Sequence, residues 1–203
     1  MRVFDCKQLQ VENQEAADKR IPILLDTASA IRWVSAEPLL GEIDIVPYMG
    51  DRTIKCKCGF KQDENWIFGA SPGAEVCMEC GNKITTYPSL DWIVCGGESG
   101  ISNARPMHPD WAYSVLKQCE ETNTPFFFKQ WGEWTHPGIN GFGTHSGKVA
   151  FIDSYGNFLD TPTEDENADC LPIKRVGKKI SGKMIGGRLY VEYPFDQQIK
   201  NDE

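Results

Sequence analysis

The stretch CGGESGISNARPMHPDWA, residues 95–112, decides how this chain folds. It follows an apolar run, LDWIVC at residues 90–95, which is typical of a strand buried on both faces. A helix is expected from His108, because Pro109 suits the first helical position and apolar residues recur at helical spacing from Trp111 onward. The stretch is therefore predicted to be a strand-to-helix loop, where α/β proteins carry functional groups.

The same alternation continues on both sides of this loop. A helix is expected after Asn13, a suitable N-cap, with Pro22 breaking or restarting it. Residues 31–36 and 125–129 are predicted to be strands, so a parallel sheet with crossover helices is expected. Residues 135–170, rich in glycine and then in acids, are expected to form one long loop.

Composition limits the classes of protein that fit. The net charge of −8 disfavours generic binding of the whole chain to nucleic acid or to anionic membranes, although six basic residues and no acid occupy residues 174–188. No apolar run approaches the ~20 residues that a membrane helix needs, and the N-terminus lacks the apolar core of a signal peptide. A cytoplasmic protein is expected.

Two cysteine pairs, in CKCGF and CMECGN, have the Cys-Gly form of metal-binding knuckles. Their separation suits a structural zinc ribbon, although the first pair has one intervening residue where two are usual; disulfides or unliganded thiols are the alternatives. Residues 51–86 are predicted to be this ribbon, inserted into an α/β unit made of residues 1–50 and 87–203. The four predicted zinc ligands are Cys56, Cys58, Cys77 and Cys80.

Polar residues follow each of the three predicted strands. If the strands are parallel, these residues converge at one edge of the sheet, where α/β proteins bind ligands. The alternative is a structural network in which Glu37 and Glu98 cap helices or pair with Lys129 and Arg105. Likewise His108 either caps a helix or joins the site, and Trp131 and Trp134 either wall a pocket or fill the core. The predicted ligand-binding residues are Glu37, Glu98, Ser99, Arg105, Lys129 and Gln130.

Five strings of the sequence, VENQEAADKRIPILL, SAEPLLGEID, DWIVCGGESGISNARPMHPDWA, PFFFKQWGEW and RVGKKISGK…GGR, resemble the phage gene-product thirty-seven/sixty-eight family. This phage and prophage family is similar in pattern to radical-SAM enzymes. The resemblance runs from about residue 11 to residue 194, and some members carry a ribbon insertion between the same two strands.

Full members of that family are about half a barrel longer at the N-terminus, where clustered cysteines are expected to hold a [4Fe–4S] cluster. Residues 1–10 do not resemble the strand that precedes this point in the family, and Cys6 alone cannot supply the several thiolates a cluster needs. The resemblance therefore implies an α/β fold, the parallel-stranded half of a (β/α) barrel with an inserted zinc ribbon. No iron–sulfur cluster is expected in this chain alone.

Three functions stay open, so whether the chain is an enzyme is undecided. It is an enzyme component that binds a polar ligand, such as a nucleotide or nucleic acid, and works with a cluster-bearing N-terminal half or a three-cysteine partner protein. Alternatively it is a non-catalytic module whose ribbon and basic residues 174–188 contact nucleic acid or protein, or it is a degenerate prophage remnant; whether the chain forms an oligomer is left open. A membrane partner is not expected.

Overall fold

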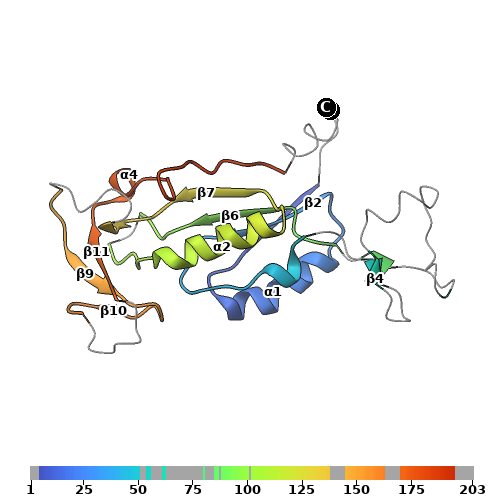
Figure 1. The fold of residues 1–203 in the computed structure, drawn as a ribbon, viewed down its shortest axis with the longest axis horizontal. Helices are drawn as coiled ribbons and strands as arrows, with labels where there is room; N and C mark the ends of the chain where they lie inside the picture. The colour runs from blue at the N-terminus through green and yellow to red at the C-terminus, as the bar shows by residue number, and fades with distance from the viewer. Residues whose placement is uncertain are drawn as a thin grey trace.

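The computed structural model describes residues 5–50, 54–55, 61–62, 80, 85–86, 88–100, 102–137, 145–162 and 170–194. A four-stranded sheet forms its centre (Figure 1). Its strands lie in the order β1 (Cys6–Gln10), β2 (Ile31–Ala36), β6 (Trp92–Gly96) and β7 (Phe126–Gln130), and every neighbouring pair is parallel. The predicted parallel sheet is thus confirmed, and β1 adds a strand at the position where residues 1–10 showed no family resemblance.

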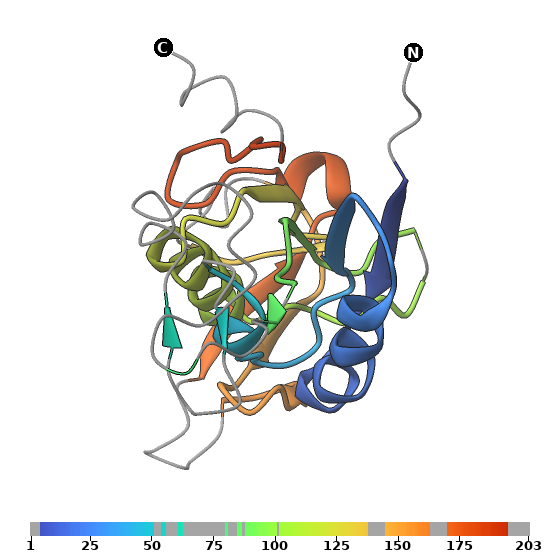
Figure 2. The ribbon, with the colours of Figure 1, turned by 90° about the vertical axis from the view of Figure 1, so that its right-hand side faces the viewer.

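Two helices connect these strands and lie on the same side of the sheet (Figures 1 and 2). Helix α1 (Gln14–Asp26) begins where the side chain of Asn13 accepts a hydrogen bond from the amide of Ala16. Helix α2 (Pro109–Glu121) begins after His108, whose Nδ1 accepts from the amide of Asp110. Both helix starts agree with the sequence, and His108 is a helix cap.

Pro22 does not interrupt α1, contrary to expectation. Ile21 and Leu24, on either side of it, are 0% and 6% exposed and pack in the core. Burial of these side chains holds the helix continuous across the missing hydrogen bond, because tertiary packing can override a local breaker.

The sheet face toward the helices is the main hydrophobic core. Successive strands contribute Val34, Ile93 and Phe126 in one row, then Cys95 and Phe128 in the next, and all are fully or nearly fully buried. Because side chains alternate along a strand, the intervening residues point to the opposite face.

That opposite face is only partly covered. Toward the amino ends of the strands it carries Trp33 and Trp92, paired across β2 and β6 with ring centroids 4.9 Å apart, and Phe127. All three are partly exposed. Toward the carboxyl ends the same face becomes polar, with Gln10 opposite Ser35. We call this surface the open face.

The free edge of β7 is covered by residues 188–193, here called the C-terminal strap, which run alongside it (Figure 1). The amide of Phe128 donates to Tyr190 O (2.9 Å), and the amide of Glu192 donates to Phe126 O (3.1 Å). In the described part of the chain, β1 has no partner on its outer edge.

A second, antiparallel sheet lies beyond the carboxyl ends of β6 and β7 (Figure 1). It is formed, in the order β10-β9-β11-β8, by Phe158–Leu159, Val149–Ile152, Leu171–Arg175 and Trp134–Thr135. The prediction of one long loop over residues 135–170 is therefore wrong. Strands this short are stable because the longer β11 pairs with two of them. Ala150, Ile152 and Ile173 are also buried against the core.

The region predicted to be a zinc ribbon is described only at a few positions. They include three two-residue antiparallel strands, β3 (Ile54–Lys55), β4 (Lys61–Gln62) and β5 (Thr85–Thr86). The remaining elements are a 3₁₀ turn, η1 (Val46–Tyr48), and the short helix α4 (Lys178–Ser181). Within the described ranges, no helix is long and apolar enough to cross a membrane.

Candidate functional site

The carboxyl ends of β2, β6 and β7 bring the predicted site residues together. Glu37 follows β2, Glu98 and Ser99 follow β6, and Lys129 and Gln130 end β7. A hollow of about 350 Å³ opens between the ends of β1, β2 and β6, and Lys129 and Gln130 of β7 reach its lining residues Glu37 and Ser99 without lining it themselves. We call it the rim hollow; it is lined by Gln8, Gln10, Ser35, Glu37, Pro38, Gly97, Glu98 and Ser99.

Lys129 and Glu37 form an ion pair across the top of β6, with Nζ 2.8 Å from Oε2. The carboxylate side chain is 18% exposed and the lysine side chain 55% exposed. Gly96 makes room for this arrangement, since a Cβ there would lie 3.4 Å from the Glu37 carboxyl carbon. The pair therefore presents one cation at the border of the hollow and one carboxylate within its wall.

Glu98 is held by Arg105, seven residues later in the same loop. Its Oε1 accepts from Arg105 Nη2 (2.8 Å), and its Oε2 accepts from Arg105 Nε (3.1 Å) and from the Arg105 amide (2.6 Å). These hydrogen bonds lower the pKa of Glu98 against the opposing effect of burial, so the carboxylate stays ionised. The interaction closes the loop and fixes one wall of the hollow.

Gln130 joins the third strand end to the second. Its Nε2 donates to Ser99 Oγ (2.9 Å) and, less closely, to the carbonyl of Gly97 (3.4 Å). The six predicted residues therefore form three pairs around one place in the fold. Sequence reasoning missed Gln8 and Gln10, which could have been found from the alternation of side chains along β1, and it noted Ser35 only as a polar strand end.

Gly97, in the quoted stretch, and Gly132, just after β7, let the backbones of two loops come close. A Cβ on Gly97 would lie 2.1 Å from Trp131 O, and a Cβ on Gly132 would lie 2.3 Å from Glu98 O. Gly132 also has φ of +88°, which favours glycine. The loops after β6 and β7 thus touch through two glycines, and this contact sets the spacing of the strand ends.

Glu133, which lies outside the predicted set, ties this region to the second sheet. Its Oε1 accepts from the amide of Gly100 (3.0 Å), its Oε2 lies 3.9 Å from Arg175 Nη2, and its carbonyl accepts from Val176 and Gly177. Glu133 therefore links the loop after β6 to the residues at the end of β11. The sequence signal was its place just beyond the end of β7.

The aromatic residues after β7 belong to the core. Trp131 and Trp134 are 2% and 6% exposed, and their indole nitrogens donate to Met184 O and Ala104 O (2.8 Å each). His136 packs against Trp131, and burial lowers its pKa to about 4. None of these three residues lines the rim hollow.

Three of the predicted zinc ligands, Cys56, Cys58 and Cys77, lie outside the described residues; Cys80 is described and exposed. Among the residues that the structure describes, no group of three or more His, Cys, Asp or Glu side chains could hold a metal. Cys95 and Cys119 are buried, and burial raises the pKa of both thiols, as expected for core cysteines.

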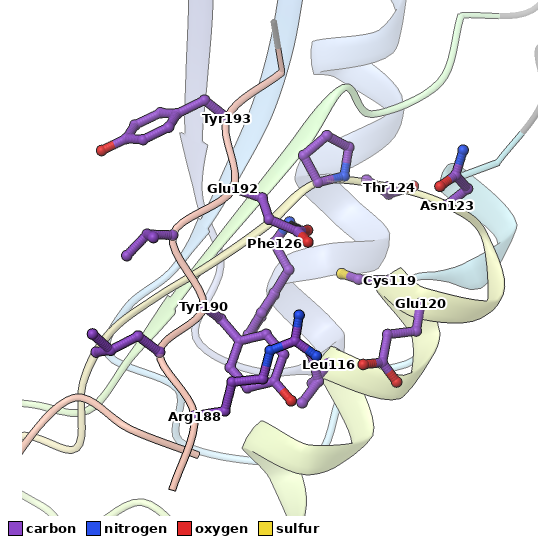
Figure 3. A pocket seen from close by; sticks show the side chains of 13 residues that line it. Leu116, Cys119, Glu120, Asn123, Thr124, Phe126, Arg188, Tyr190, Glu192 and Tyr193 are labelled. Atoms are coloured by element: carbon purple, nitrogen blue, oxygen red, sulfur yellow. Dashed lines mark hydrogen bonds between the residues drawn. The ribbon is translucent and has the colours of Figure 1, made fainter. Parts of the chain in front are cut away.

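A larger hollow, of about 790 Å³, lies at the opposite end of the sheet between α2 and the C-terminal strap (Figure 3). Phe126 and Tyr190 meet edge to face in it, and Arg188 lies 4.9 Å from the Tyr190 ring centroid. Glu192 caps the start of β7 by accepting from the Phe126 amide. These contacts anchor the strap.

The fold and the rim together define a mixed α/β protein whose parallel sheet presents a polar hollow at its carboxyl edge. The chain belongs to the family described as Protein of unknown function (DUF5131), whose model matches residues 8–194. The match begins inside β1 and ends just beyond the C-terminal strap, so both edges of the parallel sheet lie within it. Comparison with curated proteins and with solved structures gave no significant match.

Proposed function

We propose that this protein binds a polar ligand of mixed charge in the rim hollow, as the C-terminal half of a radical-SAM-like barrel from a phage or prophage. The observation that supports it most is the meeting of Glu37, Glu98 and their cationic partners around one hollow at parallel strand ends. Lys129 would hold an anionic group, and Ser99, Gln10 and the Glu37 carboxylate would bind donors and acceptors of the ligand.

The arrangement of the sheet supports the half-barrel interpretation. Strand order follows chain order, both helices lie on one face, and the other face is partly uncovered with two tryptophans on it. The strap already covers β7, so a second half would pair with β1. Such a partner would also bring the cluster, because the cysteines of this chain outside the predicted zinc site are far apart in the sequence, whereas a cluster needs several thiolates at close spacing.

Calorimetric titration with two probes, adenosine monophosphate and glutamine, tests the ligand site. We expect one of them to bind and Lys129→Met to weaken that binding about tenfold, with a loss of stability of no more than about 1 kcal/mol because the half-exposed lysine is partly screened by water. Lys117→Met is the matched control, since Lys117 pairs with Glu121 on the outside of α2. Binding of neither probe, or a loss of stability without a loss of affinity, would identify the cluster as a structural network.

The cluster assignment has its own test. Anaerobic treatment of this chain with iron and sulfide should leave the visible spectrum featureless, whereas the same treatment with a cluster-bearing partner half should give cluster absorption and a stable complex. A stable cluster with stoichiometric iron in this chain alone would contradict the proposal.

A further inference from the structure

Three exposed lysines in and after α4 differ from the other lysines of the surface. Within the described ranges, Lys178, Lys179 and Lys183 have no carboxylate partner. By contrast, five other lysines each lie 2.6–3.7 Å from a carboxylate oxygen: Lys7, Lys19, Lys117, Lys129 and Lys148. In a chain of net charge −8, three cations without a carboxylate partner thus lie within one short stretch, residues 178–183, which we call the basic segment.

The basic segment is fastened to the turn that follows β7. The amide of Trp131 donates to Gly182 O (3.1 Å), and Ser181 Oγ donates to Gly132 O (2.6 Å). The preceding residue, Gln130, reaches Ser99 in the wall of the rim hollow. The lysines therefore lie at the same end of the sheet as the hollow (Figure 1).

Neighbouring unpaired cations repel one another, and a chain of phosphates relieves that repulsion while releasing bound counterions. Ile180 lies between Lys179 and Lys183, and Met184 follows Lys183; they are 39% and 47% exposed and offer apolar contact to the faces of bases. The rim hollow, at about 350 Å³, admits a group of the size of one unstacked base and not a duplex.

We propose that the basic segment and the rim hollow form one surface for single-stranded nucleic acid. Phosphates bind Lys178, Lys179 and Lys183, and one nucleotide enters the hollow. The proposed binding of phosphates depends only on the basic segment. The proposed binding of a nucleotide in the rim hollow rests on the proposed function.

Fluorescence anisotropy with labelled oligothymidylate and oligouridylate, each about 20 nucleotides long, tests this surface. Replacing the three lysines of the basic segment by glutamine should weaken binding about tenfold or more and reduce the slope of log K against log salt by about 2. The control replaces Lys7, Lys19 and Lys117 by glutamine, which removes the same charge elsewhere and should change affinity less than about threefold.

Competition experiments identify the ligand class. We expect thymidine monophosphate and duplex DNA to compete poorly, because neither supplies a flexible chain of phosphates. Polyglutamate that binds as tightly as the oligonucleotide would reveal a surface for acidic proteins and overturn the proposal, as would equal affinity for duplex DNA.

Two variants separate this inference from the proposed function. Loss of oligonucleotide binding in the triple variant but not in Lys129→Met would support the phosphate contacts. It would also show that no nucleotide binds in the rim hollow. Loss in both supports one continuous surface. If the unaltered protein binds neither oligonucleotide, the inference fails, while the small-molecule titration still decides the proposed function.

Discussion

The ammonium group of Lys129 lies 2.8 Å from the carboxylate of Glu37, although 92 residues separate them in the chain. The contact joins the ends of β2 and β7 across β6, the strand between them. Two groups that are remote in sequence thus become neighbours because three parallel strands end at one edge. The positions of these strand ends depend on the close contact between the loops after β6 and β7.

Gly97→Ala should lower the free energy of unfolding by about 3 kcal/mol or more, because its Cβ would lie 2.1 Å from a backbone oxygen that cannot move aside cheaply. Gly100→Ala is the control: its Cβ meets nothing within 4 Å, so only the φ of +86° should cost about 1 kcal/mol. Urea unfolding measures both. Equal effects would show that the loops after β6 and β7 separate easily.

Glu98→Gln should cost about 1–2 kcal/mol of stability near neutral pH, because it removes charge-assisted hydrogen bonds to Arg105. Folding lowers the pKa of this carboxyl, so its stabilising effect is present above the unfolded pKa and is lost as pH falls through the folded pKa. The difference between the two proteins should therefore shrink on acidification. A difference that stays constant with pH would mean that charge is not its source.

His136 should make the protein less stable in acid. Burial lowers its pKa to about 4, so between the ordinary value of 6.5 and about 4 the unfolded chain binds a proton that the folded chain does not. Stability should rise with pH across this window by at most about 1.4 kcal/mol per unit, reduced by the partial exposure of the ring. His136→Phe should flatten the profile there; an unchanged profile would assign the dependence to other groups.

The zinc prediction is tested by metal analysis of the purified protein, with about one zinc per chain expected for a closed four-thiolate site. Cys77→Ser should abolish metal binding and loosen residues 51–86 to proteolysis, while the parallel sheet keeps its cooperative unfolding transition. Cys119→Ser, which alters a buried core thiol, is the control and should leave the metal content unchanged. A zinc ratio near zero with reactive thiols would rule the ribbon out.

Local signals in the sequence were sufficient for the central elements. Runs of apolar residues set β2, β6 and β7, and Asn13 and Pro109 marked the starts of the two helices. These signals act over a few residues, so they can be read without knowing the rest of the fold. The parallel-strand rule then placed the polar strand ends at one edge of the sheet, where Lys129 contacts Glu37 and Gln130 contacts Ser99.

The sequence alone left open whether Glu37 and Glu98 cap helices, bind a ligand or pair with Lys129 and Arg105, and it could not show that Gly97 and Gly132 let two loops come into contact. It also concealed the second sheet and the C-terminal strap. Strands of two to four residues, such as β8, β9 and β10, carry too little alternation to be recognised. They exist because β11 and the core lie beside them, and those contacts form only when distant parts of the chain meet.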